Sequence, residues 1–206
     1  MGILSGKRGI IFGALDENSI AWKVALEAKK EGAIFTLSNA PVALRLGTIN
    51  ELATLCQSVV IPADATNTDD LDKLFDQSIA ELGGKIDFIL HSIGMSPNVR
   101  KEKPYTNLNY DFYLKSLDIS ALSLHKILQV AYQKDAINEY GSVVALSYIA
   151  AQRAFPFYGD MAEAKAALES IARNFGYHYG IKNKVRINTV SQSPTATTAG
   201  SGVKGF

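Results

Sequence analysis

Six short apolar runs, each rich in Val, Ile, Leu or Phe, alternate along the chain with longer segments whose apolar residues recur at helical spacing. The runs predict strands near residues 8–12, 33–37, 58–61, 86–90, 141–146 and 184–190. The segments between them predict helices near residues 19–31, 48–56, 68–82, 109–135 and 159–179. Strands that are apolar throughout, rather than at alternate positions, are typical of a parallel sheet covered on both faces.

This order of elements predicts an α/β fold: a Rossmann-like doubly wound parallel sheet with helices on both faces. Residues 1–206 are expected to form a single domain, because a hydrophobic content of 47% suffices for one substantial core and no Pro/Gly/Ser-rich stretch divides the chain. In such sheets a ligand binds beyond the carboxyl ends of the strands. The loops that follow the strands are therefore where chemistry is expected.

Composition excludes several classes of function. The chain has 21 basic and 20 acidic residues with no long basic run, so no nucleic-acid partner is expected. Cys56 is the only cysteine, which excludes a disulfide framework and a thiolate metal site. The three histidines lie far apart in the sequence, and no metal is expected. Without a secretion signal or a membrane-spanning apolar run, the protein is predicted to be soluble and cytoplasmic, with no membrane partner.

Three loops have features of a dinucleotide site. Gly13 follows the first strand and permits a turn, and a helix is predicted to start near Ser19 with its free N–H groups and positive dipole end facing any pyrophosphate. An ordinary strand-to-helix connection has the same features, and the usual G-x-G-x-x-G is absent. Asp64 follows the third strand and could accept a hydrogen bond from an adenine, or cap the next helix instead. Gly94, in the sequence HSIG, would let the backbone approach a flat ligand.

Tyr158 and Lys165 stand seven residues apart. At about 100° per residue, seven helical steps bring Lys165 back to within roughly 20° of Tyr158, so both side chains can line one wall. The alternative is a solvated helix face on which the pair has no function.

The motifs together resemble one family. SIA after the first strand, HSIG after the fourth, LSY after the fifth and the Y-x6-K pattern of Tyr158 and Lys165 are similar to those of bacterial enoyl-acyl-carrier-protein reductases. These enzymes are divergent short-chain dehydrogenase/reductases, and the resemblance runs from about residue 2 to residue 206. The family continues beyond this point, so its C-terminal part is expected to be absent here.

The resemblance implies the site residues. The cofactor-binding set spans the pyrophosphate, the adenine, the ribose and the nicotinamide end, and consists of Gly13, Ser19, Ile20, Asp64, Ser92, Ile93, Gly94, Lys165 and Thr197. The catalytic set is Tyr148, Tyr158 and Lys165. Tyr148 could instead be a core aromatic residue. Phe155, Phe157 and Met161 could line an acyl slot or pack against a neighbouring subunit.

The resemblance also implies the reaction, in which hydride passes from NADH to the β-carbon of a trans-2-enoyl thioester in type II fatty acid biosynthesis. Lys165 would orient the nicotinamide ribose, and Tyr158 would stabilise the enolate. NADH is expected rather than NADPH, because Ser38-Asn39-Ala40 after the second strand includes no arginine for a 2′-phosphate. The implied partners are an acyl carrier protein that carries the substrate and three further copies of the chain in a homotetramer.

Two other functions stay open at this point. A carbonyl reductase of the same superfamily would have a Y-x3-K pattern, but position 162 is Ala162. The shorter length of the chain motivates the other, a catalytically idle protein that binds or senses a dinucleotide.

Overall fold

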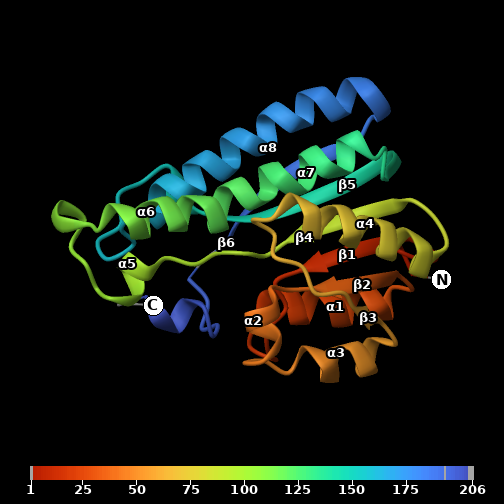
Figure 1. Ribbon diagram of the computed structural model, residues 1–206, viewed down its shortest axis with the longest axis horizontal. Helices are drawn as coiled ribbons and strands as arrows, with labels where there is room; N and C mark the ends of the chain where they lie inside the picture. The colour runs from red at the N-terminus through yellow and green to blue at the C-terminus, as the bar shows by residue number, and fades with distance from the viewer. Residues whose placement is uncertain (1, 193, 204–206) are drawn as a thin grey trace.

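The computed structural model describes residues 2–192 and 194–203, which form a six-stranded sheet in the order β3-β2-β1-β4-β5-β6. All neighbouring strands are parallel. The strands are β1 (Arg8–Phe12), β2 (Ile34–Ser38), β3 (Val59–Val60), β4 (Ile86–His91), β5 (Ile137–Tyr148) and β6 (Arg186–Gln192). The predicted doubly wound parallel sheet is confirmed, as Figure 1 shows.

The helices follow the predicted order with three differences. They are α1 (Ile20–Lys30), α2 (Pro41–Leu44), α3 (Ile49–Cys56), α4 (Thr68–Leu82), α5 (Pro97–Arg100), α6 (Tyr110–Leu117), α7 (Ser123–Gln133) and α8 (Met161–Asn183). A π-helical turn (Asp118–Leu122) separates α6 from α7, so the single helix predicted near 109–135 has an irregular middle. The four-residue helices α2 and α5 were not predicted, and α8 begins two residues later than expected.

Helices cover both faces of the sheet. On one face α1 and α3 bury apolar residues such as Trp22 and Leu52 against β1 and β2. On the other face α4, α7 and α8 contribute Phe75, Leu124 and Leu168 to a larger core. In Figure 1 the two helix layers lie above and below the sheet. The apolar residues on both sides explain why the strands are apolar along their whole length.

The strand register brings the functional loops to one edge. Phe12, the last residue of β1, lies beside Ser38 of β2 and His91 of β4, and His91 lies beside Ala145 of β5. The loops after β1, β4 and β5 therefore open at the same edge of the sheet. The chain leaves β1 toward β2 and returns on the other side of β1 as β4, so the crevice of this fold type lies between these two loops.

Helix α8 is the longest helix, with 23 residues, and packs on β5, β6 and α7. The Tyr179 hydroxyl near its end donates a hydrogen bond to the Leu128 carbonyl of α7 at 3.0 Å, which fixes the helix far from the crevice. Across residues 2–192 and 194–203, no helix combines the length and the apolar character that crossing a membrane requires.

Candidate active site

Tyr158 and Lys165 are both buried at the crevice edge, each with 7% of its surface exposed. The Lys165 ammonium donates a hydrogen bond to the Leu146 carbonyl of β5 at 2.7 Å. A Cβ placed on Gly94 would lie 3.7 Å from Lys165 Nζ. The ammonium thus lies between the end of β5 and the loop after β4, and the alternative of a solvated helix face is wrong.

An aromatic cluster lies on one side of Tyr158. The ring of Tyr148, the last residue of β5, lies 4.8 Å from that of Tyr158 at 49°, and Phe155 lies 5.3 Å from Tyr148 at 54°. Met161 packs in the same buried cluster, whereas Phe157 is 60% exposed. Phe155 and Met161 can therefore form an apolar wall beside the two phenols, while Phe157 faces outward.

Burial shifts the pKa values of Tyr158, Tyr148 and Lys165. It raises the pKa of Tyr158 well above its ordinary value, with a smaller contribution from Tyr148, and it also raises the pKa of Tyr148. Both phenols therefore keep their protons at neutral pH and can donate hydrogen bonds. Burial lowers the pKa of Lys165 to about 8, so its amine still carries a proton near pH 7.

The loops after β1 and β4 meet backbone to backbone. Gly13 has φ +90°, and a Cβ there would lie 2.0 Å from the Ser92 carbonyl oxygen, so only glycine fits. The amide of Ser92 in turn donates to the Phe12 carbonyl at 3.3 Å. The predicted cofactor residues Gly13 and Ser92 are thus held side by side.

Ser19 stands at the N-cap position of α1, but its hydroxyl is used within the loop. It donates to the Asp16 carbonyl at 2.7 Å and accepts from the Leu15 amide at 3.3 Å. Within the described residues no side chain caps α1. The first-turn amides of α1 are therefore available to an anion, as a pyrophosphate site requires.

The two predicted isoleucines lie on opposite faces of the sheet. Ile20 lines a groove of about 370 Å³ together with Leu146 and Val190, over the part of the sheet formed by β4, β5 and β6. Ile93 packs against the larger core on the other face. Leu146 joins this groove to the Lys165 contact, because it lines the groove and its carbonyl accepts the hydrogen bond from Lys165.

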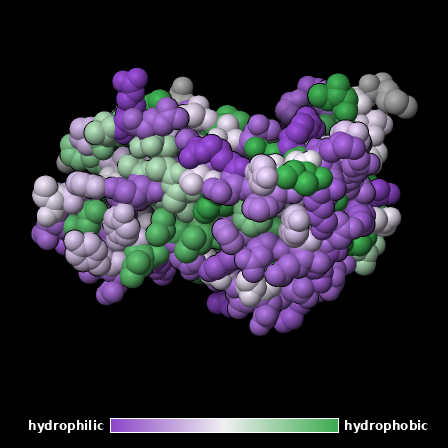
Figure 2. Space-filling model, turned by 90° about the horizontal axis from the view of Figure 1, so that it is seen from above, coloured by the Kyte–Doolittle hydropathy of each residue, from purple (hydrophilic) through white to green (hydrophobic). Residues whose placement is uncertain are grey.

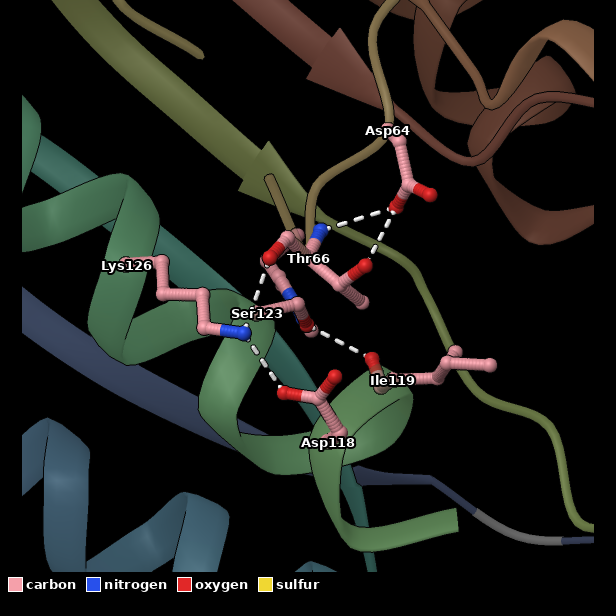
Figure 3. A network of polar contacts seen from close by, with 7 residues as sticks. Asp64, Thr66, Asp118, Ile119, Ser123 and Lys126 are labelled. Atoms are coloured by element: carbon pink, nitrogen blue, oxygen red, sulfur yellow. Dashed lines mark hydrogen bonds and ion pairs between the residues drawn. The ribbon is translucent and has the colours of Figure 1, made fainter. Parts of the chain in front are cut away.

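Asp64 closes its own turn, which Figure 3 shows. One of its carboxylate oxygens accepts hydrogen bonds from the Thr66 amide and hydroxyl, at 2.9 and 2.8 Å. The side chain that caps α4 is that of Asn67, so the helix-cap interpretation of Asp64 is wrong. Lys126 of α7 holds the turn by donating to the Thr66 carbonyl at 2.9 Å, while also pairing with Asp118 at 2.6 Å.

The histidines have separate environments. His91 is fully buried and lies 2.8 Å from Ser123 Oγ, which donates to the Ile119 carbonyl (Figure 3) and therefore accepts from the ring. Burial, with a smaller contribution from Lys165, lowers the pKa of His91 to about 3 and keeps the ring neutral. His125 and His178 line a groove between α7 and α8. The described residues contain no cluster of His, Cys, Asp and Glu that could hold a metal ion.

Thr197 belongs to a segment that spans the crevice. Its hydroxyl accepts from the Gly200 amide at 2.8 Å and stabilises a turn. The neighbouring Thr198 donates to Asp16 of the β1 loop at 2.6 Å, and Val203 packs against the aromatic cluster. Residues 194–203 thus reach from the β1 loop to the Tyr158 environment.

Sequence reasoning missed one residue of this site. Asp160 lies between Tyr158 and Lys165 and is only 1% exposed. Its carboxylate accepts hydrogen bonds from Ser96, Asn98 and Ser116. The signal that could have indicated it is the position of this carboxylate between the tyrosine and the lysine of the Y-x6-K pattern.

Known proteins are similar to this chain in sequence and in fold. The profile of the family described as Enoyl-(Acyl carrier protein) reductase matches residues 13–206. The chain is 34% identical over 207 residues to the NADH-dependent enoyl-[acyl-carrier-protein] reductase FabI of Rickettsia bellii, which covers 100% of this chain and 77% of that protein.

Solved structures agree with this similarity. The crystal structure of the FabI–NADH complex from Alistipes finegoldii matches with a TM-score of 0.96 and 63% identity, covering 98% of this chain and 71% of that one. The enoyl-[acyl-carrier-protein] reductase (NADH) from Aquifex aeolicus matches with a TM-score of 0.89 and 31% identity, covering 100% and 79%. The chain therefore spans about three quarters of the length of these relatives.

Proposed function

The chain belongs to the enoyl-(acyl carrier protein) reductase family, and on this premise we propose that it reduces a trans-2-enoyl thioester of fatty acid biosynthesis with NADH. NADH, when bound, supplies the hydride that the β-carbon of the substrate receives. The residues fit this cofactor, because no described side chain caps the first turn of α1, whose amides can face a pyrophosphate, and because Gly94 has no side chain to keep a flat ligand from the backbone beside Lys165.

Lys165 orients the ribose in this proposal. Its ammonium is fixed by the Leu146 carbonyl and lies beside Gly94, so it has further N–H groups to offer to sugar hydroxyls. This role is positioning rather than proton transfer. Thr197 and Ile20 lie at the same edge of the sheet, and we assign them to the nicotinamide and pyrophosphate sides respectively.

Tyr158 stabilises the negative charge that develops on the substrate. In a conjugate reduction this charge appears on the thioester oxygen, two carbons beyond the attacked carbon. The phenol is protonated at neutral pH and can donate a hydrogen bond to that oxygen. Such preorganised donors contribute about 2.7–4 kcal/mol to catalysis. Tyr148, Phe155 and Met161 supply the apolar wall for the acyl chain.

The observation that carries the proposal is the buried, protonated Tyr158 beside a buried Lys165 that faces the loop after β4. The test follows NADH absorbance with a crotonyl thioester as substrate. For Tyr158→Phe we expect kcat to fall by about 10²–10³-fold, the cost of one lost oxyanion donor, with NADH binding retained. Tyr177→Phe, at a 67% exposed position of α8, is the matched control and should keep full activity. Unchanged turnover in Tyr158→Phe would show that the assigned role is wrong.

The same assay separates the two other functions. A protein that only binds or senses the dinucleotide would bind NADH without reducing the thioester. A carbonyl reductase would reduce a ketone and leave the crotonyl double bond intact.

We further propose that the substrate arrives on an acyl carrier protein in the cytoplasm and that the enzyme is a homotetramer. A groove of about 680 Å³ between α7 and α8 supports the oligomer, because it is lined by apolar side chains such as Leu122, Ile171 and Phe175. Figure 2, which views the molecule from the side of α8, shows hydrophobic side chains gathered between hydrophilic ones on this surface.

A further inference from the structure

We propose that Asp160 is a positioning residue that holds Tyr158 at a fixed position relative to the loop after β4. The idea rests on the function proposed above and adds to it a residue that touches neither substrate nor cofactor. Three observations carry it: the burial of the carboxylate, the direction of its hydrogen bonds and the backbone conformation around Tyr158.

The Asp160 carboxylate joins three segments of the chain. It is 1% exposed and accepts from Ser96 Oγ at 2.6 Å, from Asn98 Nδ2 at 2.9 Å and from Ser116 Oγ at 2.7 Å. Ser96 lies two residues after Gly94, and Ser116 belongs to α6. One carboxylate thus connects the predicted cofactor loop, α6 and the segment that contains Tyr158.

The neighbouring groups fix the direction of these bonds. Ser96 Oγ accepts from the Val99 amide at 3.0 Å, so its single hydrogen is left for Asp160. Asn98 Oδ1 accepts from the Asn109 amide, and Asn98 Nδ2 also donates to the Asn109 carbonyl, so the orientation of its amide group is determined. Ser96 Oγ and Asn98 Nδ2 are therefore donors that need an acceptor at position 160. An asparagine there would point its own N–H groups at a donor, and that contact would be lost.

The backbone beside Tyr158 requires such support. Phe157 has φ +70°, a left-handed conformation that costs about 1 kcal/mol or more for a residue other than glycine. Gly159, on the other side of Tyr158, has φ +49°. A strained turn keeps its shape only where surrounding contacts determine it. Asp160 follows immediately, and its hydrogen bonds tie this turn to the neighbouring segments.

The consequence for the reaction is geometric. The Tyr158 hydroxyl must reach the thioester oxygen while Lys165 and Gly94 set the position of the cofactor. Asp160 links the Tyr158 turn to the Gly94 loop directly, so it fixes the distance between the proton donor and the cofactor site. The Gly13 contact with Ser92 does not depend on it.

The test compares Asp160→Asn with the wild-type chain. We expect kcat for crotonyl-thioester reduction to fall by about 10–100-fold, as a displacement of about 1 Å does in other enzymes, with the NADH dissociation constant unchanged. Ser116→Ala removes one donor and leaves two, so its kcat should lie between those of the wild type and Asp160→Asn. Ser78→Ala is the matched control, because it removes a buried hydrogen bond to Thr36 at 2.9 Å outside the site and should keep kcat.

Hydrogen exchange gives a readout that is independent of turnover. The amides of Tyr158, Met161 and Ala162 donate within the turn and should exchange faster in Asp160→Asn but not in Ser78→Ala. Unchanged kcat and exchange in Asp160→Asn would overturn the proposal, as would a parallel loss of NADH affinity and kcat. A wild-type chain that binds NADH but does not reduce the thioester would refute the proposed function alone, and hydrogen exchange would then decide on Asp160.

Discussion

At the scale of single residues, we expect the charge of Lys165 to set the pH range of activity. Burial lowers its pKa to about 8, and we expect kcat/KM for NADH to fall as pH rises through about 8, because this parameter reports ionisations of the free enzyme. A pH profile of initial rates between pH 6 and pH 10 checks this. A profile that stays flat across that range would contradict the assigned role of the ammonium.

Stability changes in the opposite direction over the same range. The folded-state pKa of Lys165 lies below the value of 10.5 for the free group, so the unfolded chain binds more protons between about pH 8 and pH 10.5. The contribution of Lys165 therefore raises the free energy of unfolding, and so stabilises the fold, as pH rises through this window. Comparing the pH dependence of the urea midpoint between wild type and Lys165→Met isolates this contribution. The same comparison shows whether activity lost at high pH is accompanied by unfolding.

Gly13 is the position where we expect one added methyl group to lower both stability and NADH binding most. In Gly13→Ala the added Cβ would meet the Ser92 carbonyl at 2.0 Å, so the loops after β1 and β4 must separate. We expect loss of NADH binding and a lower melting temperature. Gly6→Ala is the matched control, since Gly6 also has a positive φ (+72°) but nothing within 4 Å of the added Cβ. It should cost only about 1 kcal/mol of stability, with NADH binding measured by fluorescence unchanged.

At the scale of elements, the sequence predicted what depends on local pattern. The buried strands β1, β2 and β4 lie within one residue of their predicted bounds, because their apolar runs are continuous. The π-helical turn at Asp118–Leu122 was not predictable from local pattern, since its side chains also contact residues distant in sequence, as Ser120 Oγ does in donating to the Met95 carbonyl. Strand β5 runs from Ile137 to Tyr148 and is therefore longer than the predicted 141–146. Its first residue, Ile137, pairs with Ile86 of β4 ahead of a register irregularity, which the apolar pattern does not indicate.

In the candidate site, too, local pattern predicted some features, and contacts distant in sequence determine the others. The convergence of Tyr158 and Lys165 was predicted from helical spacing, but α8 begins at Met161, and Tyr158 lies in the turn before it. The two side chains meet the same crevice because the turn directs the phenol inward. Asp160 was missed because its three donors come from residues 44–64 positions away, which no local pattern shows.

Helix α7 supports the Asp64 turn through Lys126. Lys126→Met removes the hydrogen bond to the Thr66 carbonyl and the ion pair with Asp118, so the turn loses its anchor. We expect weaker NADH binding, measured by fluorescence titration, with little change in kcat. Lys134→Met is the matched control: Lys134 links α7 to Asp72 and Asp76 of α4, away from the turn, and its loss should leave NADH affinity unchanged. Equal effects of the two variants would show that Asp64 does not contact the cofactor.

At the scale of the whole molecule, the groove between α7 and α8 is the surface where copies of the chain are proposed to meet. Leu122 lines it and is 39% exposed. Leu122→Asp would place a charge in this apolar groove, and we expect the proposed tetramer to dissociate into smaller species in light scattering. Leu55→Asp is the matched control, because Leu55 is 63% exposed on α3 and belongs to the other helix layer. An unchanged mass for Leu122→Asp would place the interface elsewhere.

The strand order has a consequence for how the protein is made. β2 pairs with β1, β3 with β2, β4 with β1, β5 with β4 and β6 with β5. Every strand after β1 therefore finds a partner already synthesised when it leaves the ribosome. The sheet can grow outward from β1 as translation proceeds, first to one side with β2 and β3 and then to the other with β4, β5 and β6, and no strand has to be inserted between two that are already paired.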